Sequence, residues 1–216
     1  MINYNKREML RYLGYRGKSE PDAEMSAMID RCDQNLQKVV TPKSCGEYFD
    51  LSVTGDAVEF AGLTIVSHSL ARNLTGCTRI YLFAATLGVG PDRLIARAQV
   101  TKMSEALIYQ AASAAMIEAV CNELNERIDR EAQKENLYTR PRFSPGYGDC
   151  PIEFQKNFTE ILQTPKRIGL TLTDSMMMMP SKSVTAVIGI TSVPGKHHPG
   201  GCAACEVRNC EFRDAD

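Results

Sequence analysis

The sequence predicts an α+β fold, and the order of its helical and strand-like segments carries this prediction. Two helical patterns open the chain, at residues 4–15 and from about residue 19. Short strand patterns fill residues 46–66, and one dominant helical stretch, 91–134, separates them from later strands. Helices and strands in separate runs are typical of α+β domains, because a parallel sheet would need regular strand–helix alternation.

The first 66 residues are predicted to form two helices and several short strands. Apolar side chains recur at helical spacing in residues 4–15, at Met9, Leu10 and Leu13. The second helix begins near Ser19 to Pro21, where acidic residues in the first turn favour the positive end of the helix dipole. In 46–66, short apolar runs flank a Thr54-Gly55-Asp56 turn, which predicts antiparallel strands joined by tight turns.

The middle and end of the chain are predicted to hold one buried strand, a long helix and two later strands. A short helix at 68–74 precedes a strand at 78–86, which ends at Gly88 and Gly90. Pro91 opens the long helical stretch, for which we expect a break near residue 102. The remaining elements are a Pro/Gly-rich loop, a helix and two strands, at 139–151, 152–163, 168–173 and 183–191.

Composition and charge exclude several classes of function. The net charge is -1, from 25 basic and 26 acidic residues, so nothing in the charge favours nucleic-acid or anionic-membrane binding. The longest apolar stretches are much shorter than the roughly 20 residues that cross a bilayer. The polar N-terminus lacks the apolar region of a signal peptide. We therefore expect a cytoplasmic protein, with no membrane and no nucleic acid among its partners.

The loop at 139–151 is the most informative segment. It contains three prolines and two glycines, which fix the backbone in some places and free it in others. Such a loop can hold backbone groups at fixed positions beside a ligand, and Arg142 adds a planar guanidinium group that can donate two parallel hydrogen bonds to a carboxylate. An ordinary connection between a helix and the next element is the alternative interpretation.

The residues from Arg142 to Pro151 resemble the R-x-x-P-G-Y-x-x-C-P signature of the reactivation domain of cobalamin-dependent methionine synthase. Three further segments agree in order and spacing. Ile80–Thr86 with Gly88 resembles the family's buried strand, and 117–127 resembles its long helix. Residues 172–184 resemble its L-T-x-S-x-x-M-x-P-x-x-S-V region. The resemblance covers roughly residues 76–192.

The resemblance implies both the fold and the activity. The fold would be a central antiparallel sheet flanked by helices. The activity would be S-adenosylmethionine binding in support of the reductive methylation of cob(II)alamin on a partner methionine synthase in trans. The implied partners are a cobalamin-binding methionine synthase core, or a related corrinoid protein, and a flavodoxin- or ferredoxin-type electron donor. The chain would then be an accessory part of a methyltransferase system.

The resemblance also implies roles for individual residues. Arg142 would grip the carboxylate of the methionine moiety, and backbone groups at Ser144 and Gly146 would contact the ligand. Tyr147 would lie near the ligand and the corrin. Glu118 would hydrogen-bond the ligand, with a solvated helix charge as the alternative. The expected organisation is an N-terminal part, 1–66, joined in one domain to an S-adenosylmethionine-binding core, 67–194, and a Cys-rich tail, 195–216.

The Cys-rich tail suggests a second kind of site. Cys202, Cys205 and Cys210 form a C-x2-C-x4-C pattern, and thiolates at this spacing can bind zinc or an iron–sulfur cluster. Cys150, or a histidine of the pair at 197–198, would be the fourth ligand. Free thiols or a redox-active thiol pair are the alternatives. A metal centre here could pass the electron that the reductive methylation requires. A corrinoid-protein adaptor is the second hypothesis, and a redox protein whose Cys-rich tail is the active part is the third.

Two groups of sulfur-containing residues are expected in the core. The run at 176–179 consists of four methionines and predicts a strand packed on both faces, since methionine fills irregular gaps in cores. Four other cysteines are expected to be buried apolar residues: Cys32, Cys45, Cys77 and Cys121. His68 stands alone near a helix start, where a capping or surface role is expected.

Overall fold

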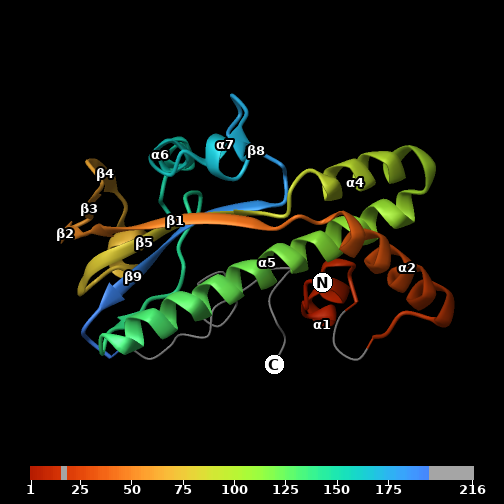
Figure 1. Ribbon diagram of the computed structural model, residues 1–216, viewed down its shortest axis with the longest axis horizontal. Helices are drawn as coiled ribbons and strands as arrows, with labels where there is room; N and C mark the ends of the chain where they lie inside the picture. Colours follow the sequence, from red (N-terminus) through yellow and green to blue (C-terminus); the bar gives the residue numbers. More distant parts are fainter. Residues whose placement is uncertain (16–18, 195–216) are drawn as a thin grey trace.

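A central antiparallel sheet organises the protein, as Figure 1 shows for the computed structural model, which describes residues 1–15 and 19–194. Within these residues four strands form it, in the order β1-β5-β9-β6. Their bounds are Lys43–Asp50, Cys77–Thr86, Ser183–Thr191 and Tyr138–Thr139. Every pairing is antiparallel. The predicted α+β class, with a central antiparallel sheet flanked by helices, is confirmed.

Strand β5 occupies the middle of this sheet, and its side chains alternate between two cores. Tyr81 and Phe83 belong to the core on one face, and Ile80 and Leu82 belong to the core on the other. Because both faces are covered, the strand reads as a continuous apolar run and not as an alternating one.

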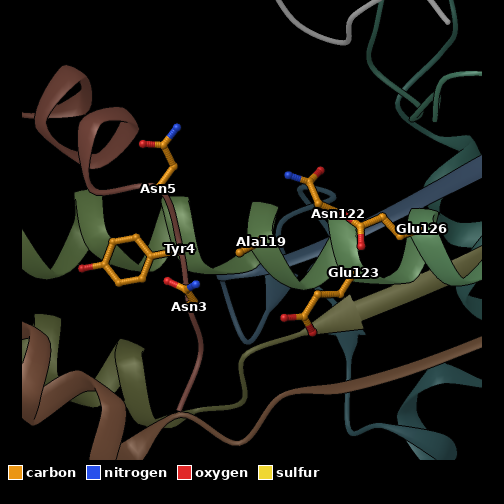
Figure 2. Close-up of a pocket in the computed structure, with 7 residues that line it drawn as sticks. All are labelled: Asn3, Tyr4, Asn5, Ala119, Asn122, Glu123 and Glu126. Atoms are coloured by element: carbon orange, nitrogen blue, oxygen red, sulfur yellow. The ribbon is translucent and has the colours of Figure 1, made fainter.

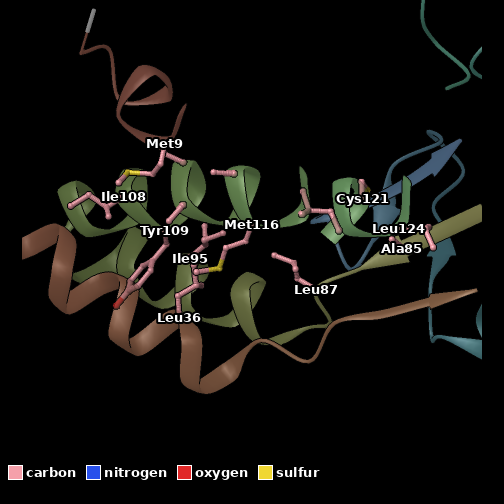
Figure 3. Close-up of a cluster of buried hydrophobic side chains, with 14 of the residues drawn as sticks. Met9, Leu36, Ala85, Leu87, Ile95, Ile108, Tyr109, Met116, Cys121 and Leu124 are labelled. Carbon is pink, nitrogen blue, oxygen red and sulfur yellow. The ribbon is translucent and has the colours of Figure 1, made fainter. Parts of the chain in front are cut away.

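Four helices cover one face of the sheet: α1 (Lys6–Tyr12), α2 (Ala23–Val39), α4 (Gly90–Thr101) and α5 (Met103–Lys134). Figure 3 shows how Met9 and Leu36 from the first two helices meet residues of α4 and α5. Lys102 has extended backbone angles, φ -152 and ψ 94, and this residue interrupts the long helical stretch where a break was predicted.

Short elements cover the other face of the sheet (Figure 1). A small antiparallel sheet precedes helix α3. Two short helices follow the loop at 139–151, and after them comes a hairpin whose two strands have two residues each. Their bounds are β2 Ser52–Thr54, β3 Ala57–Phe60, β4 Leu63–Val66, α3 His68–Asn73, α6 Phe154–Ile161, α7 Thr164–Arg167, β7 Thr171–Leu172 and β8 Met178–Met179.

The methionine run is not the buried strand that the sequence suggested. Only Met178 and Met179 form a strand, β8, which pairs with β7. Met177 is 64% exposed and Met179 is 55% exposed. The prediction of a core strand was wrong, because Met177 and Met179 face solvent while Met178 is partly buried against the core. The four cysteines expected in the core are buried, as predicted.

None of the helices that the structure describes is both long and apolar enough to cross a lipid bilayer.

Candidate functional site

The signature loop, residues 142–151, contains a tight turn at Ser144–Tyr147. The Ser144 carbonyl accepts a hydrogen bond from the Tyr147 N–H at 3.2 Å. Pro145 and Gly146 are the two central residues, and Gly146 has φ +90. Proline followed by a residue with positive φ is the signature of a type II turn. Pro145 and Gly146 of the signature are therefore required by the backbone of the turn itself.

Backbone hydrogen bonds fix the loop at both ends. Phe143 pairs with Val187 of β9 through two reciprocal bonds of 2.9 Å, which joins the loop to the central sheet. Further on, the Gly146 N–H donates to the Cys150 carbonyl at 2.9 Å, and the Cys150 N–H donates to the Tyr147 carbonyl at 3.0 Å. The loop is therefore a preformed structure before any ligand binds.

Asp149 connects the loop to the first turn of α3. Its carboxylate accepts hydrogen bonds from Ser67 Oγ at 2.7 Å, the His68 N–H at 2.8 Å and the Ser69 N–H at 2.9 Å. These bonds favour the charged form and hold the pKa of Asp149 well below its usual range. Sequence reasoning assigned Asp149 no role. The structure also places His68 at the exposed start of α3, as expected.

Arg142 lies against α5, held by side chains of that helix. Its Nη2 donates to the Glu118 carboxylate, and its Nη1 donates to Asn122 Oδ1 at 2.7 Å. With the Asn125 amide oriented so that its nitrogen donates to the Cys121 carbonyl at 3.2 Å, its oxygen accepts from the same Nη1 at 2.8 Å. The Arg142 side chain is 23% exposed and that of Glu118 is 34% exposed, so solvent reaches both partners.

The three partners of Arg142 form one stripe along α5. Glu118, Asn122 and Asn125 are spaced i, i+4 and i+7, and this spacing lines up side chains on one helix face. Sequence reasoning found Glu118 and missed the two asparagines, which the helical spacing from Glu118 could have identified. Near this stripe lies Tyr12 of α1. Burial, and then the carboxylates of Glu8 and Glu118, raise the pKa of Tyr12 to about 12.

A surface depression of about 340 Å³ adjoins this stripe where the N-terminal segment crosses α5 (Figure 2). Asn122 belongs both to its lining and to the contacts of Arg142. The N-terminal wall is fixed, because Gln37 exchanges two hydrogen bonds with the backbone of Ile2, at 2.9 and 2.8 Å. The lining is mostly polar: Asn3, Tyr4, Asn5, Ala119, Asn122, Glu123 and Glu126.

The structure brings together some of the residues named from the sequence and separates others. Glu118 and Arg142 form an ion pair. Tyr147 is 65% exposed and stands edge-on to Phe143, with ring centroids 6.3 Å apart. Tyr147 is not part of the lining of the depression. Of the loop groups, the Ser144 carbonyl and the Gly146 N–H are already engaged within the loop.

The metal-site hypothesis finds no support in the described residues. Cys150 is buried, and burial raises the pKa of its thiol to about 11. No cluster of His, Cys, Asp and Glu suited to a metal ion occurs within residues 1–15 and 19–194. The histidine pair at 197–198 lies outside the described residues, as do Cys202, Cys205 and Cys210.

Two comparisons with known proteins establish the fold and the family. The fold is similar to the crystal structure of the MetH reactivation domain bound to AdoHcy, with a TM-score of 0.65 and 18% sequence identity. That similarity covers 88% of this chain and 77% of that chain, and it shows that the fold is shared. The family model for the activation domain of vitamin B12-dependent methionine synthase matches residues 70–194, more than half of the chain. The chain therefore belongs to the activation-domain family of vitamin B12-dependent methionine synthase.

Proposed function

We propose that this protein binds S-adenosylmethionine and supports the reductive methylation of cob(II)alamin on a partner methionine synthase in trans. The observation that carries the proposal is the ion pair between Arg142 of the signature loop and Glu118 of α5, which lies beside a depression. A related protein with the same fold binds AdoHcy, the product that S-adenosylmethionine leaves after methyl transfer.

The ion pair has the chemistry that an amino-acid moiety requires. A methionine end carries one carboxylate and one ammonium group, which are complementary to a guanidinium and a carboxylate side by side. In this arrangement Arg142 binds the ligand carboxylate through the N–H groups of its planar fork. Glu118 accepts from the ligand ammonium group. Asn122 and Asn125 keep the guanidinium in place while the ligand enters.

The depression offers suitable partners for the rest of the ligand. Asparagine side chains both donate and accept hydrogen bonds, which suits the hydroxyl groups of a ribose. Glu123 and Glu126, also in the lining, attract the positive charge of the sulfonium. The Asn122 side chain lies at the border between the depression and the ion pair, so it would contact the ligand where its methionine moiety meets its ribose.

The protein contributes positioning to the reaction and need not donate or accept a proton. Cobalamin on the partner supplies the nucleophile when it is reduced, and a flavodoxin- or ferredoxin-type protein supplies the electron. Holding a methyl donor in the correct geometry can lower a barrier by about 7–11 kcal/mol. The hard chemistry belongs to the cofactor, and this chain binds and orients the sulfonium.

Ligand binding is tested with Arg142→Ala and titration calorimetry. Loss of a charged, bidentate contact is worth about 1.5–3 kcal/mol, so we expect the dissociation constant for S-adenosylmethionine to rise at least about tenfold. Arg79→Ala is the matched control, because Arg79 also pairs with a carboxylate, Glu135, at 2.6 Å. Equal affinities in the wild type and Arg142→Ala would contradict the assignment of the site.

The reaction itself is tested by reconstitution. The chain is mixed with cob(II)alamin-loaded methionine synthase that lacks its own activation domain, a reductant and S-adenosylmethionine labelled in the methyl group. We expect label on the corrinoid only when the chain is present, and less of it with Arg142→Ala. Binding of S-adenosylmethionine without any transfer of label would contradict the methyl-transfer role and favour a corrinoid-protein adaptor.

A further inference from the structure

We propose that Asp149 is a positioning residue, whose carboxylate ties the signature loop to the first turn of α3 and so holds the loop in its ligand-binding geometry. The inference rests on the proposed function for its ligand. It concerns a residue that lies between the fixed positions of the signature motif. It also gives a role to Ser67, His68 and Ser69, which precede the residues matched by the family model.

The carboxylate uses both oxygens in this contact. Oδ1 accepts from Ser67 Oγ at 2.7 Å and from the Ser69 N–H at 2.9 Å, and Oδ2 accepts from the His68 N–H at 2.8 Å. The first N–H groups of a helix have no partner within the helix, and a negative charge there also meets the positive end of the helix dipole. Asp149, from a distant part of the chain, therefore accepts hydrogen bonds from N–H groups at the start of α3 that have no partner within the helix.

The α3 end of this contact is rigid. Ser67 is buried, its Oγ accepts from the Leu70 N–H at 3.1 Å, and its own N–H donates to the Asp56 carbonyl at 2.9 Å. Leu70 and Ala71 of the helix are buried in the core between the small sheet and the central sheet. Because the start of α3 is fixed on several sides, it provides a firm anchor for the loop.

The loop end of the contact lies next to the bonds that shape the turn. Gly148 has φ +56, and a Cβ there would come within 2.4 Å of Ser69 Oγ and 2.7 Å of Ser69 Cβ, so the loop backbone packs closely against the Ser69 side chain. Cys150 follows Asp149 directly and makes both of the bonds that close the loop on Gly146 and Tyr147. Release of the carboxylate would therefore loosen the segment from Gly146 to Cys150 before other parts of the fold.

The experiment compares Asp149→Ala with Asp22→Ala. Asp22 is a matched control, because its carboxylate caps α2 through the Met25 N–H at 2.8 Å and does not contact the loop. Amide hydrogen exchange is followed at Gly146 and Cys150, with Val187 as the internal reference. Affinity for S-adenosylmethionine is measured by calorimetry on the same proteins.

We expect Asp149→Ala to accelerate exchange at Gly146 and Cys150 at least about tenfold, to leave exchange at Val187 unchanged and to weaken S-adenosylmethionine binding by a similar factor. Asp149→Asn keeps one acceptor oxygen and should restore part of both effects. Wild-type exchange at the loop amides, or the same changes in Asp22→Ala, would overturn the proposal. If the wild type itself fails to bind S-adenosylmethionine, the proposed function fails, while accelerated loop exchange would still support the anchoring role.

Discussion

Two glycines with the same backbone conformation differ in what surrounds them. Gly55 has φ +60, and a Cβ there would meet no atom within 4 Å, whereas a Cβ on Gly148 would approach Ser69 Oγ to 2.4 Å. Both alanine variants lose about 1–2 kcal/mol from the left-handed backbone. We expect Gly148→Ala to lose at least about 1 kcal/mol more, because the loop must also move away from α3.

Urea unfolding of the two variants and the wild type measures this difference in the free energy of unfolding. Gly55 is the appropriate reference because the backbone cost is common to both positions. Equal losses in Gly55→Ala and Gly148→Ala would mean that the loop moves away from α3 without cost, and that the close packing of these two segments contributes nothing to stability.

At the scale of single residues, the sequence named candidate side chains but not the contacts between them. The resemblance assigned both Glu118 and Arg142 to the ligand, but it did not indicate that they pair with each other. That contact depends on how the sheet carries the signature loop to α5, through the pairing of Phe143 with Val187. A local sequence pattern does not indicate such placement, and the hydrogen bonds between Asp149 and the start of α3 were missed for the same reason.

Helix α3 and the loop share a contact that titrates, so its strength should depend on pH. The hydrogen bonds from α3 hold the pKa of Asp149 below its usual range. A carboxylate with a lowered folded-state pKa stabilises the fold at pH values above its unfolded-state pKa of about 3.9. That contribution is lost as the pH falls toward the folded-state pKa.

We therefore expect the stability difference between the wild type and Asp149→Asn to be constant from about pH 7 to pH 5 and to shrink below about pH 4. Urea unfolding at each pH gives this difference directly, since asparagine does not titrate. A difference that stays the same down to pH 3, or grows there, would show that the charge on Asp149 is not what binds α3.

At the scale of elements, the long periodic segments could be predicted, and several of the shortest segments could not. The break between α4 and α5 at Lys102 was predicted, and the strand expected at 183–191 is β9. The two-residue strand β6 and the four-residue α7 escaped prediction, and of the strand expected at 176–179 only the last two residues form one, as β8. Segments of two to four residues are too short to show a periodic hydrophobic pattern, and tertiary contacts alone specify their conformation. The exposed Met177 shows the same limit, because its hydrophobicity says nothing about whether another layer covers it.

The whole molecule depends on parts of the chain that the family match does not include. The matched range, 70–194, begins inside α3 and leaves out α1, α2 and β1. Strand β1 pairs with β5 along its entire length: Lys43 lies opposite Thr86 at one end, and Asp50 lies opposite Arg79 at the other. Helices α1 and α2 contribute Met9 and Leu36 to the core on α5, where each is almost fully buried. The N-terminal part is therefore continuous with both the sheet and one of the two cores.

A chain of residues 70–194 should accordingly fail to fold, whereas residues 1–194 keep all of the buried core residues described. Each large apolar side chain removed from the core takes away about 1.5–3 kcal/mol, and a domain of this kind has a total stability of about 5–15 kcal/mol. The loss of Met9, Ile29 and Leu36 alone approaches that total, and the exposed edge of β5 would favour aggregation.

Circular dichroism during heating compares the two chains: a cooperative transition is expected for 1–194 and none for 70–194. A cooperative transition in the shorter chain would mean that the matched range folds by itself and that the N-terminal helices and β1 are additions to a complete domain.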